Sequence, residues 1–300
     1  MNPMGIIAFF ALRKLAKLSL APSDSTMPED AFPLESLIRS ADMAKLAYDD
    51  PKDLEDKGRN IVSEGRYNFF DAKADMDTDG SSQAHVWINQ SAREAFVFFR
   101  GTDCRKDALI NLDIRQKEKS EQFKNAMVHR GFSRQFYAIE NKMNEFLKLY
   151  RNEYDTLTFT GHSLGGALAT IATFHYIHDF ADEEHPPLIT CHTFGSPRVG
   201  DKNFSRLFEK QVPGARHWRV FDYEDPIPVI PASWRFHHVK GNAICLGRPG
   251  KLRIERTDVP WLLRPLSGII NIRLARLVSS HAMENYISKL KQLKNGKHIA

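Results

Sequence analysis

Residues 157–172, which read LTFTGHSLGGALATIA, decide the fold of this chain. The first four alternate large apolar residues with threonine, a pattern typical of a β-strand, whereas the stretch from Gly166 onward is rich in alanine and leucine and favours a helix. Between the two lies the pattern G-x-S-x-G, formed by Gly161, Ser163 and Gly165. The sequence therefore predicts a serine at a sharp turn from a strand into a helix.

Such a turn has physical consequences for Ser163 and its neighbours. It places the serine backbone in an unusual conformation and packs the helix closely on the strand, so that Gly161 and Gly165 have no room for a side chain. It also lifts the hydroxyl above the sheet and points the helix N-terminus, whose first N–H groups have no partner within the helix, at the same place. We therefore interpret Ser163 as a nucleophile, and a plain glycine and serine turn is the alternative.

The rest of the chain supports a layered α/β arrangement around this turn. A helix that starts after Pro33 precedes three strand-like runs, and strands then alternate with helices, which predicts a mainly parallel central sheet with helices on both faces. We expect an N-terminal apolar and basic segment at residues 1–30 and one α/β domain at residues 31–300. The expected helices cover residues 34–48, 132–150, 163–180 and 202–210, and the expected strands cover residues 67–70, 85–88, 95–99, 156–160, 188–194 and 217–221.

A serine hydroxyl becomes a strong nucleophile only when a base takes its proton and an acid orients that base. After this type of turn the acid and the histidine follow the serine in that order. His281 is the late histidine inside a structured stretch, whereas His298 lies near the chain end. Asp222, Glu224 and Asp225 are the acids that follow the next expected strand. We choose Asp225 because three prolines within the next six residues stiffen its loop, and the other two acids remain alternatives.

Short motifs in a fixed order carry a resemblance to a known family. They are Ala47-Tyr48, FRGT at 99–102, VHRGF at 128–132, TGHSLGGA at 160–167, TFGSPRVG at 193–200, the Asp225 segment, and His281 with Tyr286. From about Ala41 to Tyr286 the chain resembles the class 3 lipases, the fungal-type triacylglycerol lipases with their bacterial and plant phospholipase relatives. The resemblance implies an α/β-hydrolase fold for residues 31–300 and a catalytic triad of Ser163, Asp225 and His281.

The resemblance also implies an oxyanion hole. The backbone N–H of Leu164, the residue after the nucleophile, would be one donor. Thr102 would supply the other through its N–H, assisted by its hydroxyl. Preorganised donors of this kind typically contribute about 3 to 4 kcal/mol to stabilisation of the transition state.

The chain departs from the family pattern directly after Thr102. Family members carry a short apolar lid with a tryptophan at this place. Here residues 103–112 read DCRKDALINL, with Ala108 at the tryptophan position and four charged residues. We therefore expect weak activation at an oil interface and a preference for smaller, micellar or phospholipid esters.

Composition and charge bound the remaining possibilities. With 42% apolar and 26% charged residues over 300 positions, the chain is an ordinary folded one, which excludes a disordered or collagen-like protein. The net charge is +5, but residues 251–300 hold ten Lys and Arg against three acidic residues, so the excess lies at the C-terminal end. This basic end suggests an anionic membrane surface or, as the alternative, a solvated helix face, and we expect no nucleic-acid partner.

The N-terminal end is apolar but too short to cross a membrane. Its longest apolar run has nine residues, 4–12, whereas a spanning helix needs roughly 20. Cations follow this run, whereas a secretory signal would place them before it. We expect a cytoplasmic or membrane-peripheral protein rather than a secreted one. Peripheral membrane contact of this segment is one hypothesis, and its packing on the protein itself is the alternative.

No metal or organic cofactor is expected. The three cysteines, Cys104, Cys191 and Cys245, are too few and too scattered for a disulfide framework or a four-ligand zinc site. His175 and His178 share a helix face, but the sequence places no acidic residue or third ligand beside them, so we expect packing or surface roles for both.

Together these patterns predict a serine hydrolase that works through an acyl-enzyme, and the resemblance implies that it acts on carboxylic esters of lipids, as a triacylglycerol lipase or a phospholipase A1. An acyltransferase or a thioesterase with the same three residues would differ only in the leaving group and the acceptor. A non-catalytic interaction module on the same scaffold is a further alternative.

Overall fold

The computed structural model describes residues 33–73, 81–101, 117–119, 126–212, 216–231, 235–247, 253–255 and 279–295. The expected N-terminal segment at residues 1–30, Thr102 and the lid-like residues 103–112 lie outside these ranges. The expectations for these three parts of the chain therefore stay predictions.

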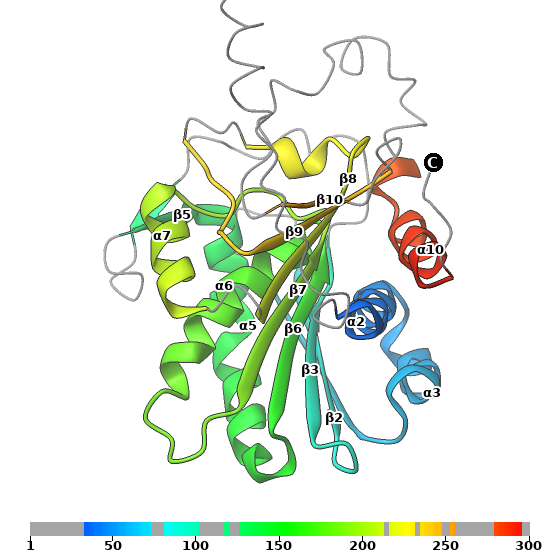
Figure 1. Ribbon diagram of the computed structural model, residues 1–300. Helices are drawn as coiled ribbons and strands as arrows, with labels where there is room; N and C mark the ends of the chain where they lie inside the picture. The colour runs from blue at the N-terminus through cyan, green and yellow to red at the C-terminus, as the bar shows by residue number, and fades with distance from the viewer. Residues whose placement is uncertain are drawn as a thin grey trace, which may run out of the picture.

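The described strands form an eight-stranded sheet in the order β1-β2-β3-β6-β7-β8-β9-β10, together with a small sheet of β4 and β5 (Figure 1). The central strands β3, β6, β7, β8 and β9 run parallel, and antiparallel strands pair at both edges. Their bounds are β1 Arg66–Lys73, β2 Ser81–Asn89, β3 Glu94–Phe99, β4 Lys117–Lys119, β5 Met127–His129, β6 Thr156–His162, β7 Leu188–Phe194, β8 His217–Asp222, β9 Asn242–Leu246 and β10 Arg253–Glu255.

The strand register brings the carboxyl ends of the central strands to one edge of the sheet. Phe99 at the end of β3 pairs with Gly161 of β6, and His162 at the end of β6 pairs with Phe194 of β7. Phe194 in turn pairs with Val220 of β8. Because the loops that follow parallel strands leave from the same edge, the residues after β3, β6, β7 and β8 lie close together there.

Helices cover both faces of the sheet (Figure 1). One face carries α2, α3 and α10, and the other carries α5, α6 and α7. The predicted α/β class, a mainly parallel sheet with helices on both faces, is confirmed. The bounds of these helices are α2 Leu34–Leu46, α3 Pro51–Val62, α5 Arg130–Leu149, α6 Leu164–Asp179, α7 Lys202–Gln211 and α10 Met283–Lys294.

Apolar layers hold the helices on the sheet. On one face, α2 and α10 pack on β7, β8 and β9, and Leu37, Tyr286 and Leu290 are fully buried there. On the other face, α6 is buried along most of its length against the sheet and contacts α5 and α7. Burying one large apolar side chain contributes about 1.5 to 3 kcal/mol, so the layer under α10 fixes the segment around His281, just before this helix.

The sequence patterns do not predict α3, β9 or β10. The helix α3 gives a weak periodic signal because it is rich in charged residues and buries only Leu54, Gly58 and Val62. It begins where the Asp50 side chain caps the first turn and Pro51 occupies the first helical position. Local capping chemistry, rather than an apolar stripe, is therefore the signal that could have located this helix.

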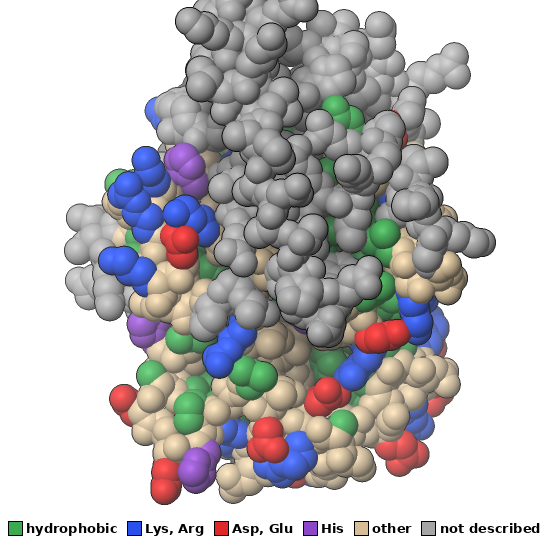
Figure 2. Space-filling view, in the orientation of Figure 1, with side chains coloured by type: hydrophobic (Ala, Val, Ile, Leu, Met, Phe, Trp, Pro, Cys, Tyr) green, Lys and Arg blue, Asp and Glu red, His purple; other side chains and the backbone are tan. Residues whose placement is uncertain are grey.

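Charged side chains of both signs are spread over the described surface in Figure 2. Among the described residues, the large apolar side chains that are exposed are Met127, Leu149 and Leu188. No helix within the described ranges is long and apolar enough to cross a bilayer.

Candidate active site

Ser163 occupies the turn between β6 and α6. Its backbone has φ 57° and ψ −126°, a conformation that residues with a side chain rarely adopt. The N–H of Ser163 donates to the carbonyl of Phe194 at 2.9 Å, which holds the strained turn against the end of β7. The side chain is fully buried. The predicted strand-to-helix turn and its unusual torsions are confirmed.

Two glycines leave space for this turn. A Cβ atom on Gly161 would lie 2.4 Å from the carbonyl of Gly165, and a Cβ on Gly165 would lie 2.2 Å from the carbonyl oxygen of Phe99. Both distances are too short for any side chain, because the neighbouring atoms belong to the backbone and cannot move aside. The predicted crowding of helix against strand is confirmed, and it extends to the end of β3.

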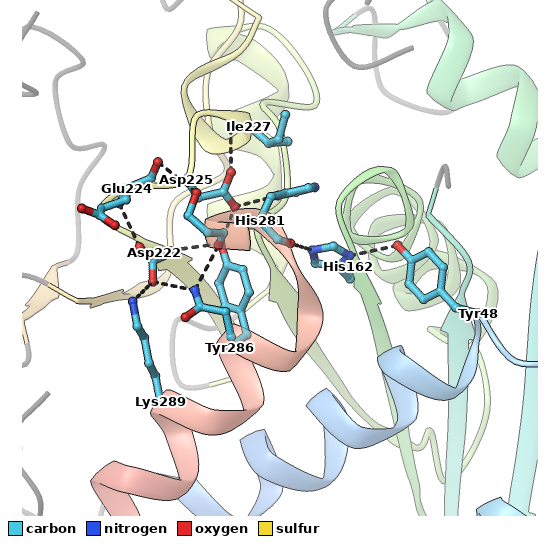
Figure 3. A network of polar contacts seen from close by, with 11 residues as sticks. Tyr48, His162, Asp222, Glu224, Asp225, Ile227, His281, Tyr286 and Lys289 are labelled. Atoms are coloured by element: carbon cyan, nitrogen blue, oxygen red, sulfur yellow. Dashed lines mark hydrogen bonds and ion pairs between the residues drawn. The ribbon is translucent and has the colours of Figure 1, made fainter. Parts of the chain in front are cut away.

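Asp225 and His281 meet at the same edge of the sheet (Figure 3). His281 Nδ1 lies 2.7 Å from Asp225 Oδ2, and both side chains are buried. The same Oδ2 accepts from the hydroxyl of Tyr286 at 2.5 Å, while Oδ1 accepts from the backbone N–H of Ile227 at 2.9 Å. Since an ionised carboxylate only accepts, these three donors fix the orientation of Asp225.

The contact with Asp225 defines the tautomer of His281. Because Nδ1 faces a carboxylate, the neutral ring carries its proton on Nδ1, and Nε2 is left as the acceptor. Nε2 of His281 and Oγ of Ser163 are both buried and form no hydrogen bond to any described residue. In a serine triad these are the two atoms between which the first proton moves.

The structure shows which of the three candidate acids is the partner of His281. Asp222, also fully buried, pairs with the ammonium of Lys289 and accepts from Asn285 Nδ2 at 3.0 Å and from the backbone N–H of Glu224 at 2.8 Å (Figure 3). Its carboxylate therefore links β8 to α10. Glu224 is exposed to solvent. Of the three acids, Asp225 is the one that contacts His281.

The loop after Asp225 is held by a neighbouring arginine. Arg198, only 1% exposed, donates through Nη1 to the carbonyls of Val229 and Pro231, the latter at 2.8 Å. Its backbone N–H also donates to the carbonyl of Ile230 at 2.9 Å. The proline-rich loop has few N–H groups of its own, so these bonds satisfy its buried carbonyls. Arg198 lies in the TFGSPRVG motif, but the sequence alone did not assign it this contact.

One of the two expected oxyanion donors lies within the described residues. Leu164 is the first residue of α6, so its backbone N–H belongs to the first helical turn, where N–H groups have no partner within the helix. Thr102 lies outside the described residues, while its neighbour Gly101 follows the end of β3. The packing of Gly165 on Phe99 brings this end of β3 against the start of α6. The oxyanion roles of Leu164 and Thr102 stay predictions.

The expectation that His175 has no acidic neighbour is wrong. His175 Nε2 lies 3.0 Å from Oε1 of Glu140 on α5 and 3.5 Å from Oδ2 of Asp179, one turn further along α6. Asp179 also accepts from Asn144 Nδ2 at 3.0 Å. The ligand atoms of the three residues lie within 4.8 Å of one another, a geometry that could accept a cation. In the structure they form a largely buried polar cluster that joins α5 to α6. Asp179 lies four residues from His175 and could have been found from the sequence, whereas the contact with Glu140, 35 residues away, could not.

A mainly parallel sheet with a serine turn after β6, an acid after β8 and a histidine just before α10 defines the class of α/β-hydrolases. Residues 96–234 match the family model described as Lipase (class 3), and the chain is similar to this family.

Individual relatives support this similarity. The chain is 29% identical over 165 residues to a phospholipase A(1), DAD1, chloroplastic, from Arabidopsis thaliana, an alignment that covers 54% of this chain and 35% of that protein. The chain thus spans about a third of the length of this curated relative.

Solved structures share the fold at lower identity. Lipase II from Rhizopus niveus has a TM-score of 0.62 at 22% identity, over 75% of this chain and 86% of that one. A triacylglycerol lipase, described as having a serine protease triad as its catalytic centre, has a TM-score of 0.61 at 19% identity, again over 75% and 86% of the two chains.

Proposed function

We propose that this protein is a serine hydrolase that cleaves carboxylic esters of lipids through an acyl-enzyme. The observation that carries the proposal is the buried pair of Asp225 and His281, joined at 2.7 Å, at the same sheet edge as the strained turn that holds Ser163. Such an arrangement provides a nucleophile, a base and a group that orients the base, which is the minimum that acyl transfer by serine requires.

The reaction follows from these roles. Ser163 Oγ attacks the ester carbonyl while His281 Nε2 takes its proton, and Asp225 stabilises the resulting imidazolium. The N–H of Leu164 and the donors of Thr102 stabilise the negative carbonyl oxygen. The ester C–O bond breaks, His281 returns its proton to the leaving alcohol, and the acyl group stays on Ser163. Water, deprotonated by His281, then releases the fatty acid and regenerates the serine.

The substrate class is inferred from relatives and from the lid sequence. The Arabidopsis relative is named a phospholipase A1, and the two solved neighbours are named lipases, so a lipid ester is the substrate class that their names share. The charged sequence at residues 103–112 favours phospholipid or micellar esters over an oil phase. Hydrolysis rates on triglyceride, phospholipid and thioester panels would rank these substrates and would reveal a thioesterase.

The decisive experiment uses a fluorophosphonate probe and a short p-nitrophenyl ester. The wild-type protein should react covalently at Ser163, and Ser163→Ala should lose both labelling and ester hydrolysis while its melting temperature does not fall. Full activity in Ser163→Ala would refute the mechanism. A wild-type protein that neither reacts with the probe nor hydrolyses any ester would instead support a non-catalytic module.

Peripheral membrane contact is a separate proposal that rests on the sequence. The apolar run at residues 4–12 and the basic C-terminal fifty residues provide the two kinds of attraction, insertion and charge, that hold a protein on an anionic surface. Deleting residues 1–25 should weaken binding to anionic vesicles at low salt. Unchanged binding after this deletion would show that the N-terminal segment plays no part.

A further inference from the structure

His162, the residue just before the nucleophile, uses both of its ring nitrogens. It is the last residue of β6 and is buried. Its Nδ1 lies 2.9 Å from the hydroxyl of Tyr48, and its Nε2 lies 2.6 Å from the backbone carbonyl oxygen of His281 (Figure 3). A single side chain thus connects the serine turn, the end of the first described helix and the backbone of the proposed catalytic base.

The partners of His162 define its tautomer. The carbonyl of His281 can only accept a hydrogen bond, so Nε2 of His162 carries the proton and donates. Nδ1 is then an acceptor, and the hydroxyl of Tyr48 donates to it. Burial lowers the pKa of His162 well below its ordinary value, and the charge of His281 lowers it further. His162 therefore remains neutral when His281 takes a proton, which avoids a second positive charge beside the imidazolium.

Packing around these bonds leaves little freedom. The rings of His162 and His281 lie 4.5 Å apart between centroids, and Tyr286 contacts the His162 ring edge-on at 5.9 Å. The Tyr48 hydroxyl also fits closely against the end of β3, because a Cβ on Gly101 would approach it to 2.2 Å. The His162 ring therefore packs against the His281 ring, and the Tyr48 hydroxyl packs against Gly101.

We propose that His162 is a positioning residue for the reaction proposed above, holding the backbone of His281 so that Nε2 of the base stays in line with Ser163, and that Tyr48 anchors the His162 ring from its other side through the bond to Nδ1. The inference rests on the proposed function. Without the Tyr48 hydroxyl, Nδ1 of the buried His162 ring loses its donor, and the ring loses one of its two anchors. The ring can then move, and the segment that carries the base shifts with it.

The test is Tyr48→Phe, which removes one oxygen and keeps the ring. Displacing a catalytic group by a fraction of an ångström impairs the chemical step more than substrate binding. We expect kcat for a p-nitrophenyl ester to fall about tenfold, equivalent to about 1.4 kcal/mol, with KM changed less than about twofold. The rate of fluorophosphonate labelling should fall in parallel, because it also needs His281 to activate Ser163.

The chain offers a matched control. The hydroxyl of Tyr67 forms a hydrogen bond with Nδ1 of His85 at the same distance of 2.9 Å, but this pair lies on β1 and β2 in the antiparallel part of the sheet. Tyr67→Phe removes the same kind of bond. It should therefore change thermal stability to a similar extent as Tyr48→Phe while kcat remains that of the wild type.

A second pair of variants keeps the test valid if Tyr48→Phe folds poorly. His162→Phe keeps a ring but loses both nitrogens, whereas the amide nitrogen of His162→Gln can reach the Nε2 position and donate to the carbonyl of His281. We expect His162→Gln to recover a large part of the kcat that His162→Phe loses. Equal kcat in the two variants would overturn the positioning role.

The outcomes separate this inference from the proposed function. If wild-type protein shows neither labelling nor hydrolysis, the proposed function is wrong. If the wild type is active and Tyr48→Phe matches Tyr67→Phe in kcat, or loses only substrate affinity with kcat unchanged, the function stands and the positioning role is refuted.

Discussion

Replacing Tyr286 by phenylalanine tests how firmly the acid of the candidate triad is held. The Tyr286 hydroxyl donates to Asp225 Oδ2 at 2.5 Å and accepts from the backbone N–H of Asp222 at 3.1 Å. Burial and the nearby Asp225 carboxylate raise the pKa of Tyr286 well above its ordinary value, so the hydroxyl remains a donor at neutral pH. The substitution removes both bonds and keeps the buried ring.

The expected magnitude follows from these two bonds. A hydrogen bond to a charged group contributes about 1.5 to 3 kcal/mol, and a buried N–H without a partner costs about 1 to 3 kcal/mol. We expect the free energy of unfolding of Tyr286→Phe to fall by about 3 kcal/mol. Asp225 keeps its bonds to His281 and to the N–H of Ile227, so the carboxylate stays near its place but moves more. We expect kcat to fall about tenfold with little change in KM.

The assay combines urea unfolding at pH 7 with steady-state hydrolysis of a p-nitrophenyl ester. Tyr154→Phe is the control, because Tyr154 is equally buried and donates to a neutral acceptor, the carbonyl of Leu147, at 3.1 Å. We expect it to lower the free energy of unfolding by about 1 kcal/mol and to leave kcat unchanged. An unchanged unfolding free energy in Tyr286→Phe, or equal kcat in the two variants, would refute the reasoning.

Further predictions address the acid, its loop and the buried histidines. Asp225→Asn should lower kcat for ester hydrolysis by about 10³- to 10⁴-fold. Asp222→Asn should keep kcat within a few fold of the wild type, while its free energy of unfolding in urea falls by about 2 to 3 kcal/mol. Similar losses of kcat in both variants would contradict the assignment of Asp225 as the acid. Arg198→Met should lower the unfolding free energy by about 3 kcal/mol and decrease kcat, because the acid loop loses two donors; a fully active variant would show that the loop holds itself. Burial lowers the pKa of His192 to about 4 and that of His217 to about 3. Below pH 6.5 the unfolded chain therefore binds more protons than the folded protein. The free energy of unfolding should fall from pH 6.5 toward pH 4, by up to about 1.4 kcal/mol per pH unit for each ring. Urea unfolding at pH 7 and pH 5 would measure this pH dependence. If His217→Phe shows the same pH dependence as the wild type, His217 does not contribute to it.

The sequence specified the serine turn because every constraint on it is local. The alternation at residues 157–160, the crowded glycines at 161 and 165 and the helix that follows all lie within a window of about fifteen residues. Strand period, turn sterics and helix propensity act over such windows, so the residues alone predicted the fold class and the place of Ser163. The structure bears out both, including the positive φ of the serine.

The contacts of polar groups across the sheet edge were decided only by the tertiary structure. Three acids within four residues had similar local signals, and the docking of α10 on the sheet settled which one meets His281, 56 residues further along the chain. The same holds for the contact of Glu140 with His175.

What the sequence determined by itself is the scaffold and its nucleophile, since backbone torsions and apolar periodicity are properties of neighbouring residues. What the tertiary structure decided is the set of partners: Asp225 for His281, Lys289 for Asp222, and Tyr48 for His162. These pairings depend on strand register and helix docking, which many distant apolar contacts fix together, so no short window of sequence contains them.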